Sequence, residues 1–405
     1  MRVPLRIAPD LSIECGVTVF RVGIGASVLA DSTMAGRQAA ESALSGLAGG
    51  EPALVVVFAT ASHDLPVLLA AVRQVTGDAP LVGASSSGQF SAGTLIPPGQ
   101  GVSVLVLGSG RYRFGVASVS GLRANAFEAG RELARSCLAA AGPERDRHAA
   151  LMVFSDGLAG DPQGLLNGVY QVTGAAVPVV GGAAAADRDL SETLVFHDGR
   201  VLGDGAVGVW IDSPRPLRVV SGHGWQAHGL PLLVTNVDGP VVHEIGGRPA
   251  RAVYEQNFRY DDPMQELPTA WSQGYHSAHA FGLIEPDGSQ LIRGAFIDED
   301  GLIRTFTPLP PYSAVQIMTA GPDDLLDISE PLIADALDGA DATVLLTFSC
   351  AARMDILRER GAEEAVRLQK AAGPVATFGF YTYGEFARTT GVSGYHNATL
   401  TALAL

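Results

Sequence analysis

The first half of the sequence contains the same strand–helix–strand pattern twice, and this repeat restricts the fold more than any other feature. The two copies span residues 54–83 and 151–181. Their helices end in VRQVTG (72–77) and VYQVTG (169–174), so that five of six residues agree. Repetition of this kind predicts a fold built from similar units packed against one another.

Local chemistry explains the pattern within each copy. Apolar runs rich in β-branched residues, such as 54–58 and 151–154, are typical of buried strands. The glycine after each helix accepts a positive φ, and the proline that follows prevents the helix from continuing. Each copy is therefore predicted to be a βαβ unit, and a further apolar strand follows it, at 102–107 and 206–211.

A weaker third copy closes the chain. Its predicted strands are 343–348, 374–378 and 398–403, with a helix at 363–372. The region 221–320 between the second and third copies is different in composition. Its turn sequences lie at 237–239, 286–288 and 298–301, and they predict an antiparallel segment.

These patterns give one fold-class prediction and one domain prediction. The class is α/β, with repeated βαβ-type units forming mixed sheets and an antiparallel segment in the C-terminal half. The proline-rich bend at 213–216 is taken as the boundary. We therefore expect an N-terminal domain at 20–215, which contains the two βαβ-like repeats, and a C-terminal domain at 216–405.

Charge excludes several functions. The formal net charge is −15, which disfavours nucleic acid and anionic lipid as partners. Of the 27 basic residues only Lys370 is a lysine, and it follows Gln369. A phosphate-binding loop of the Walker type needs a lysine after glycine, so this class of NTPase is excluded.

Cysteine usage and hydropathy predict the compartment. Cys15, Cys137 and Cys350 are far apart and form no CxxC pair, so neither a disulfide framework nor a structural zinc site is expected. No stretch approaches the ~18 apolar residues that would span a bilayer. We expect a cytoplasmic protein with no membrane partner.

The loops that follow the second strand of each copy are the predicted binding loops, because ligands of open α/β sheets bind beyond the carboxyl ends of strands. These loops are 83–88, 181–187 and 379–385. Small residues let a ligand approach the backbone, and hydroxyls supply donors and acceptors. Tight turns that need small residues for packing are the alternative explanation.

The three serines of the first loop, Ser85, Ser86 and Ser87, also suggest a serine hydrolase. The Gly-x-Ser-x-Gly sequence that exposes a nucleophile in such enzymes is absent. Nothing in the sequence pairs a histidine with these serines. A hydrolase-like enzyme therefore remains a second alternative, and a non-catalytic role is favoured.

Several motifs together resemble those of a stand-alone FIST protein with N-terminal and C-terminal FIST domains, a likeness that covers nearly everything after about residue 20. The motifs are LVGASSSGQF (81–90), FSDG (154–157), VVGGAAAAD (179–187), FSC (348–350) followed by Arg353, GFYTYGEF (379–386) and HNAT (396–399). In one departure, the serine loop begins Gly83-Ala84 where the family often has Gly-Cys, so a thiol role is absent there.

The resemblance implies a function. FIST domains are intracellular sensory domains of bacterial signalling that bind a small ligand, with amino acids or related metabolites suggested. Their partners are histidine kinases, chemoreceptors or cyclic-dinucleotide enzymes, and here a separate partner is expected because the FIST domains fill the chain. No cofactor is expected; some members are described as haem-binding nitric-oxide sensors, and this is the first alternative function.

The residues themselves suggest how an amino acid would bind. Its carboxylate matches a bidentate guanidinium and its ammonium matches a carboxylate, which makes Arg353 and Glu385 candidates. Pairing of these two residues with each other, or helix capping, is an equal alternative; for Asp156 and Asp187 the alternative is helix N-capping. The full set of predicted ligand-binding residues is Ser85, Ser86, Ser87, Asp156, Gly181, Gly182, Asp187, Cys350, Arg353, Tyr381, Tyr383, Gly384, Glu385 and Asn397.

Overall fold

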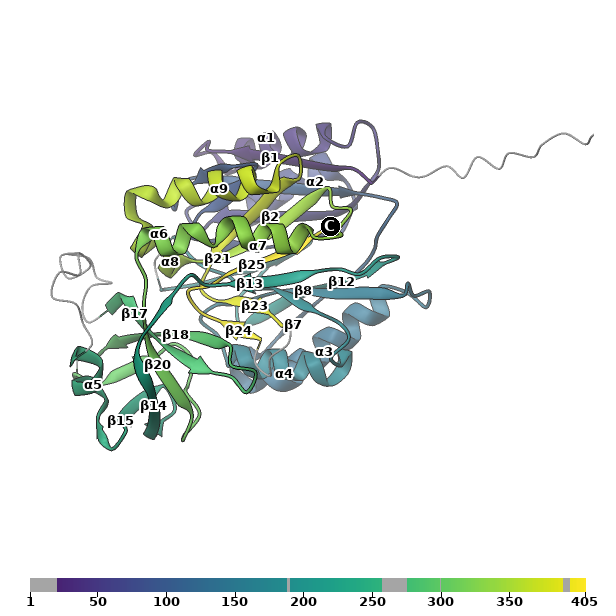
Figure 1. The fold of residues 1–405 in the computed structure, drawn as a ribbon. Helices are drawn as coiled ribbons and strands as arrows, with labels where there is room; N and C mark the ends of the chain where they lie inside the picture. Colours follow the sequence, from purple (N-terminus) through teal and green to yellow (C-terminus); the bar gives the residue numbers. More distant parts are fainter. Residues whose placement is uncertain (1–19, 188–189, 257–274, 299, 389–393) are drawn as a thin grey trace, which may run out of the picture.

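Three similar repeats form the body of the molecule, and an antiparallel β-barrel is inserted into the third (Figure 1). The computed structural model describes residues 20–187, 190–256, 275–298, 300–388 and 394–405, with the backbone alone for 275–278. None of the described helices is both long enough and apolar enough to cross a bilayer.

Each repeat begins with a strand, and four consecutive strands end it. Repeat 1 consists of β1 (Val22–Ser27), α1 (Ser32–Ser45), β2 (Pro52–Thr60), α2 (Leu65–Thr76), β3 (Leu81–Ser86), β4 (Gln89–Ser91), β5 (Thr94–Ile96) and β6 (Val102–Gly108). Repeat 2 consists of β7 (Arg113–Ser120), α3 (Leu122–Ala140), β8 (His148–Ser155), α4 (Pro162–Thr173), β9 (Val179–Ala183), β10 (Val195–His197), β11 (Arg200–Leu202) and β12 (Gly205–Ser213).

Repeat 3 is interrupted by the barrel. It consists of β13 (Val219–Gly222), α6 (Pro322–Asp327), α7 (Ser329–Leu337), β21 (Val344–Cys350), α8 (Ala351–Leu357), α9 (Gly361–Ala372), β22 (Ala376–Thr382), β23 (Glu385–Ala387), β24 (Tyr395–His396) and β25 (Leu400–Ala404). The barrel consists of β14 (Gln226–Asp238), β15 (Val241–Ile245), β16 (Arg248–Pro249), α5 (Ala250–Gln256), β17 (Tyr275–Ile284), β18 (Gln290–Ile297), β19 (Ile303–Thr305) and β20 (Ala314–Thr319).

Local signals at the helix ends are those that the sequence predicts. At the start of α2, the Asp64 side chain accepts a hydrogen bond from the Val67 amide, and Pro66 occupies the first turn. Gly77 ends this helix with φ +72°, and Gly174 ends α4 with φ +70°. The strands β2–β3, β8–β9 and β21–β22 pair in parallel around such helices, so the predicted βαβ units are confirmed.

The repeats exchange strands in a closed cycle. The first sheet has the order β1-β6-β2-β3-β10-β11, in which the last two strands come from repeat 2. Repeat 2 in turn receives β23 and β24 from repeat 3, and the sheet of repeat 3 receives β4 and β5 from repeat 1. Each repeat thus completes its neighbour's sheet, and the predicted class of mixed sheets built from βαβ-type units is confirmed.

Glycines fix where the exchanged strands cross. Gly83, Gly181 and Gly379 occupy the same position in β3, β9 and β22, and a phenylalanine of the incoming strand lies directly opposite each of them. The opposing residues are Phe196, Phe386 and Phe90, respectively. A Cβ at these glycines would lie 1.7–2.0 Å from a carbonyl oxygen of the neighbouring parallel strand, so no larger residue fits.

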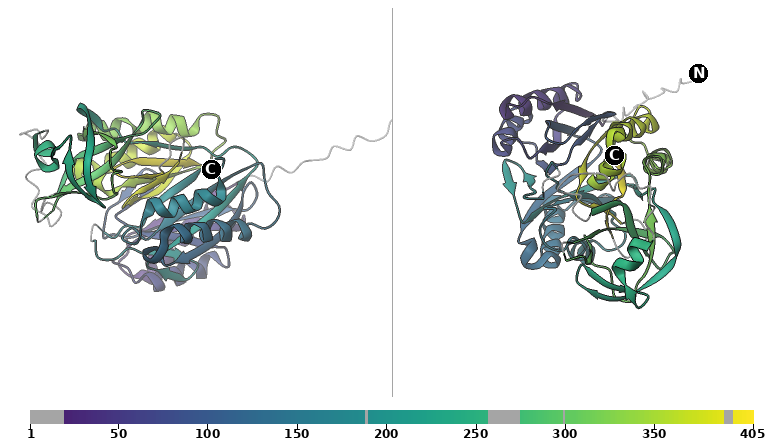
Figure 2. Two further views of the ribbon diagram at one scale, coloured as in Figure 1. Left: turned by 90° about the horizontal axis from the view of Figure 1, so that it is seen from below. Right: turned by 90° about the vertical axis from the view of Figure 1, so that its left-hand side faces the viewer.

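The sheets face one another across a shared core, and the helices lie outside (Figure 2). Helices α1 and α2 cover the first sheet, α3 and α4 the second, and α7 and α9 the third. At the centre, Phe58, Phe154 and Phe348 come from equivalent positions of β2, β8 and β21. Their ring centroids are 5.4, 6.5 and 5.9 Å apart.

The inserted segment is antiparallel throughout its described strands, as predicted. Seven strands follow the order β14-β20-β17-β18-β19-β15-β16, and pairing of β14 with β15 closes the sheet on itself. The predicted turns connect β14 to β15, β17 to β18, and β18 to β19. In Figure 1 the barrel is a distinct lobe beside repeat 3.

The crossing glycines give a prediction about stability. Replacement Gly83→Ala should lower the free energy of unfolding by about 3 kcal/mol, because the new methyl group would collide with the Val57 carbonyl oxygen at 1.8 Å. Gly203→Ala is the control, since its nearest neighbour, a Leu194 methyl carbon, would be 3.7 Å away. Urea unfolding measures both variants, and equal stability would contradict this explanation of the glycine.

Candidate functional site

A cavity of about 360 Å³ lies where repeat 2, repeat 3 and the barrel meet. Repeat 2 contributes the loop after β8, repeat 3 contributes the ends of β21 and β22 with the residues before β25, and the barrel contributes two residues. The residues that line the cavity are Asp156, Gly157, Leu158, Ala159, Gly160, Pro162, Ala183, Leu190, Gly294, Phe306, Cys350, Ala351, Ala352, Asp355, Thr382, Tyr383, Tyr395, Asn397 and Ala398.

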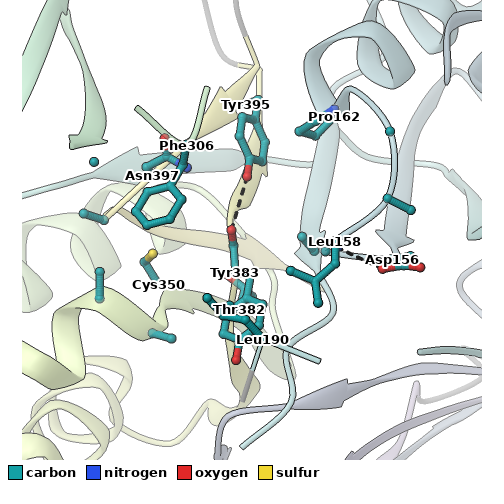
Figure 3. A pocket seen from close by; sticks show the side chains of 18 of the residues that line it. Asp156, Leu158, Pro162, Leu190, Phe306, Cys350, Thr382, Tyr383, Tyr395 and Asn397 are labelled. Carbon is teal, nitrogen blue, oxygen red and sulfur yellow. Dashed lines mark hydrogen bonds between the residues drawn. The ribbon is translucent and has the colours of Figure 1, made fainter. Parts of the chain in front are cut away.

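Four of the residues predicted from the sequence line this cavity: Asp156, Cys350, Tyr383 and Asn397 (Figure 3). Asp156 follows β8, Cys350 ends β21 and Tyr383 follows β22, whereas Asn397 follows β24. The structure thus brings these four residues together at the junction of repeats 2 and 3, and their contact with a ligand stays a prediction.

Asp156 shapes the wall of the cavity. Its carboxylate accepts hydrogen bonds from the amides of Leu158, at 2.9 Å, and Asp204, at 2.7 Å, and from the Thr193 hydroxyl. These contacts fix the loop that carries Leu158 into the lining. Asp156 does not cap α4, whose N-cap residue is Asp161.

Cys350, which lines the cavity, and Glu385, which lies behind the lining, form a buried pair. The Glu385 carboxylate accepts hydrogen bonds from the Thr382 hydroxyl and from the Thr399 amide, at 3.1 Å. Burial raises the pKa of Glu385 to about 8, although these hydrogen bonds oppose the shift. Burial, together with the Glu385 charge, also holds the pKa of the Cys350 thiol well above its usual value, so the thiol is neutral at pH 7.

Arg353 lies outside the lining, in a fully buried polar network. Its Nε and Nη2 donate to Glu364 Oε1, at 2.9 and 2.6 Å. Further donations reach the carbonyl oxygens of His223 and Leu325. The other oxygen of Glu364 accepts from the hydroxyls of Ser349 and Tyr381.

This network changes what we expect of Arg353. The alternative of an ion pair between Arg353 and Glu385 is not realised, since Arg353 pairs with Glu364 instead. Tyr381 is also fully buried, and its ring packs against Phe90 of repeat 1 with centroids 4.7 Å apart. Both residues support the fold, and their contact with a ligand stays a prediction.

The serine loop and Asp187 meet at the junction of repeats 1 and 2. Ser85 Oγ accepts a hydrogen bond from the Leu194 amide, and Ser86 Oγ donates to the Ala59 carbonyl oxygen. The amide of Ser87 donates to the Tyr381 carbonyl oxygen.

Asp187 is bound by the backbone of repeat 1. Its carboxylate accepts hydrogen bonds from the amides of Gly99, at 2.6 Å, and Ser62, at 3.3 Å. Burial raises its pKa, and these amides oppose the shift. Asp187 therefore ties two repeats together and, like Asp156, caps no described helix.

The predicted glycines of the second and third loops lie in the backbone next to the cavity. Gly181 and Gly182 belong to β9, where they pair with Phe386 and Glu385 of the exchanged strand. The Gly384 carbonyl oxygen accepts a hydrogen bond from the Ala183 amide at 2.7 Å. A Cβ would collide with the Val153 backbone at Gly181, with the Thr382 side chain at Gly182 and with the Tyr395 ring at Gly384. None of the three glycines is among the described residues that line the cavity.

The lining was also tested for a haem or metal ligand. No histidine is among the described residues that line the cavity, so it offers no imidazole to hold a haem iron. Within the described part of the chain, no group of three His, Cys, Asp or Glu side chains is placed to hold a metal ion. Haem binding therefore stays an alternative prediction.

Several lining residues were missed by the sequence analysis, chiefly Leu158, Gly294, Phe306, Asp355 and Tyr395. Leu158 and Tyr395 are close in sequence to predicted residues, and proximity to the FSDG and HNAT motifs could have indicated them. Gly294 and Phe306 carry no such signal, since they belong to the barrel and reach the site only through its packing against the repeats.

Comparison with protein families places two models on this chain. A model described as FIST N domain matches residues 53–248, and one described as FIST C domain matches residues 250–388. An uncharacterized protein of Mycobacterium tuberculosis strain H37Rv is 28% identical over 389 residues, which cover 94% of this chain and 98% of that protein. An uncharacterized protein of Mycobacterium bovis is 26% identical over 398 residues, which cover 94% and 97%.

Solved structures show only a distant likeness. Cyanuric acid hydrolase from A. caulinodans is 11% identical with a TM-score of 0.37, and the match covers 95% of this chain and 99% of that one. A chorismatase is 10% identical with a TM-score of 0.35, covering 89% and 95%. Similarity at this level assigns no activity to the chain.

The buried network around Arg353 predicts a large effect on stability. Arg353→Ala should lower the free energy of unfolding by about 3–5 kcal/mol, because Glu364 would keep a buried charge without its partner. Arg367→Ala is the control: this arginine pairs with Asp327 at the exposed surface and should cost less than about 1 kcal/mol. Equal effects in urea unfolding would show that the network does not support the fold.

The raised pKa of Glu385 predicts that the free energy of unfolding depends on pH. Its pKa is about 8 in the folded protein against an ordinary value of 4.5, so the folded state holds a proton that the unfolded chain releases. The free energy of unfolding should therefore fall as pH rises between these values, until the folded carboxyl has also ionised. In Glu385→Gln this decline should be smaller.

The measurement is the difference in urea stability between wild type and Glu385→Gln at pH 6.5, 7.25 and 8. His223 and His396 have folded pKa values of about 4 because of burial, so in this range they titrate only in the unfolded chain, and their contribution cancels in the difference between the two proteins. Parallel curves for the two proteins would contradict the assigned pKa of Glu385.

Proposed function

This chain belongs to the FIST family, whose domains are sensory domains of signal-transduction proteins, and we propose that it is a non-catalytic sensor that binds a small ligand in the cavity between repeat 2, repeat 3 and the barrel. The observation that carries the proposal is the composition of the cavity wall. One ligand there would contact three separate parts of the fold at the same time.

A ligand that contacts repeat 2, repeat 3 and the barrel would couple occupancy of the cavity to the relative placement of these three parts. A ligand shifts a conformational equilibrium only if it binds one state more tightly than the other. Leu158 belongs to repeat 2, Tyr383 to repeat 3 and Phe306 to the barrel, so their relative placement sets the fit of the ligand. A change in how the barrel sits on the repeats would alter affinity, and binding would favour one placement in return.

The polar groups near the site favour binding over catalysis. The Ser86 hydroxyl donates to a backbone carbonyl oxygen, where a serine hydrolase would need a contact to a histidine nitrogen. The Cys350 thiol is kept neutral by burial, whereas a nucleophilic cysteine needs a lowered pKa. Both features suit side chains that shape a binding site.

The family suggests a class of ligand and a class of signalling partner. An amino acid or related metabolite is the ligand class that we take forward, and its size suits a cavity of about 360 Å³. The signal would pass to a separate protein, such as a histidine kinase, a chemoreceptor or a cyclic-dinucleotide enzyme.

The experiment is a thermal-shift screen of wild type and of Ala352→Phe against the twenty amino acids, their decarboxylated amines and common central metabolites. A binding compound at a hundredfold over its Kd should add about 2.7 kcal/mol of stability to wild type. Ala352 lies in the cavity wall, and a phenyl group there should occupy the space and abolish the shift.

Ala362→Phe is the matched control, because Ala362 is exposed on α9 and outside the lining. It should respond to the ligand as wild type does. The proposal of a sensor site in this cavity would be overturned if no compound shifted the melting temperature of wild type. It would also be overturned if Ala352→Phe responded to the ligand as wild type does.

A further inference from the structure

The walls of the cavity have a distinct chemistry that bears on its ligand. Three aromatic rings line it: Tyr383 and Tyr395 from repeat 3 and Phe306 from the barrel (Figure 3). Tyr395 is almost completely buried, and its hydroxyl donates to the Tyr383 carbonyl oxygen at 3.2 Å, which fixes the ring in the wall. The faces of such rings carry negative potential and attract cations.

The charged groups in the wall have the same sign. Asp156 and Asp355 both line the cavity, and each is less than a tenth exposed. Glu385 lies one side chain further back, behind Thr382, and it is protonated at pH 7 because burial raises its pKa to about 8. Among the described lining residues there is no lysine, arginine or histidine.

Two described arginines that lie close to lining residues in the sequence are held by other groups of the protein. Arg353 is paired with Glu364 inside the network described above. Arg293, next to the lining residue Gly294, is buried and donates to the carbonyl oxygens of Ile292 and Tyr395. The only lysine, Lys370, is exposed on α9.

We propose that the ligand of this cavity is a small organic cation, an amine or guanidine with an apolar body and no carboxylate or phosphate group. This inference rests on the proposed sensor function and specifies its ligand. The cationic head would lie against the aromatic rings and the carboxylates of the wall, while the apolar body would contact Leu158 and Pro162. An anionic group would meet carboxylates and no cation among the described lining residues, so a decarboxylated amino acid suits the site better than the amino acid itself.

A charge series on one molecular body tests this. Tyramine is a cation, N-acetyltyramine is neutral, tyrosine is a zwitterion and 3-(4-hydroxyphenyl)propionate is an anion. Agmatine against arginine and cadaverine against lysine extend the comparison to other bodies. Isothermal titration of the full-length protein should give at least one amine that binds at least tenfold more tightly than its zwitterion, with no binding of the anion.

Variants locate the binding. Phe306→Leu keeps the rim apolar and removes the ring, and it should weaken amine binding about threefold to tenfold while leaving the neutral analogue unchanged. Phe306 is 43% exposed, so the change should not unfold the protein. Phe127→Leu on α3 is the matched control, with 37% exposure and no place in the lining.

The outcomes separate the two proposals. If a neutral or anionic compound binds more tightly than every amine, and Ala352→Phe abolishes that binding, the sensor site stands and the cation inference is wrong. If an amine binds equally well to Ala352→Phe, the cation inference is also wrong, because the binding is elsewhere. If no compound of the screen or of the charge series binds, both proposals fail.

Discussion

Three phenylalanine rings at the centre of the molecule hold its architecture together. Equivalent strands of the three repeats carry these rings near their ends, at Phe58, Phe154 and Phe348. The rings touch because the inner face of each sheet packs against the same core. Such contacts among buried aromatic rings add geometric preference to the burial of apolar area. A single repeat could not form this cluster, because the other two rings belong to the other two repeats.

The exchanged strands make each repeat depend on another repeat for a complete sheet. Each sheet needs a hairpin from the next repeat, and each hairpin places a phenylalanine opposite a glycine whose Cβ would collide with the backbone of the neighbouring parallel strand. The cycle brings the carboxyl ends of all three parallel pairs to the junctions between repeats. The barrel adds Gly294 and Phe306 to the lining of the cavity at the junction of repeats 2 and 3.

The parts of the fold that the sequence predicted are those that local chemistry decides. The βαβ copies show in β-branched runs, in Gly77 and Gly174 after helices, and in the turns of the barrel. Strand exchange was not predicted, because pairing of β10 with β3 joins residues more than a hundred positions apart and three-residue strands have little pattern of their own. The same limit applies to the site: Asp156, Cys350, Tyr383 and Asn397 follow strand ends, whereas Phe306 comes from the barrel and the Glu364 partner of Arg353 comes from α9.

Comparison of equivalent positions in repeats 1 and 3 shows that packing alone does not explain the carboxyl group of Glu385. Gln89 of repeat 1 and Glu385 of repeat 3 begin the exchanged strands β4 and β23 and lie opposite equivalent residues of β22 and β9. Gln89 donates to Ser86 three residues earlier, and Glu385 accepts from Thr382 three residues earlier, so one geometry accommodates either an amide or a carboxyl. A buried carboxyl costs more than an amide, and the fold does not require it. Glu385 lies at the junction that has the cavity, and this points to the chemistry of that site. The carboxyl is protonated at pH 7, because burial raises its pKa to about 8, and a cation bound in the cavity would favour its ionised form.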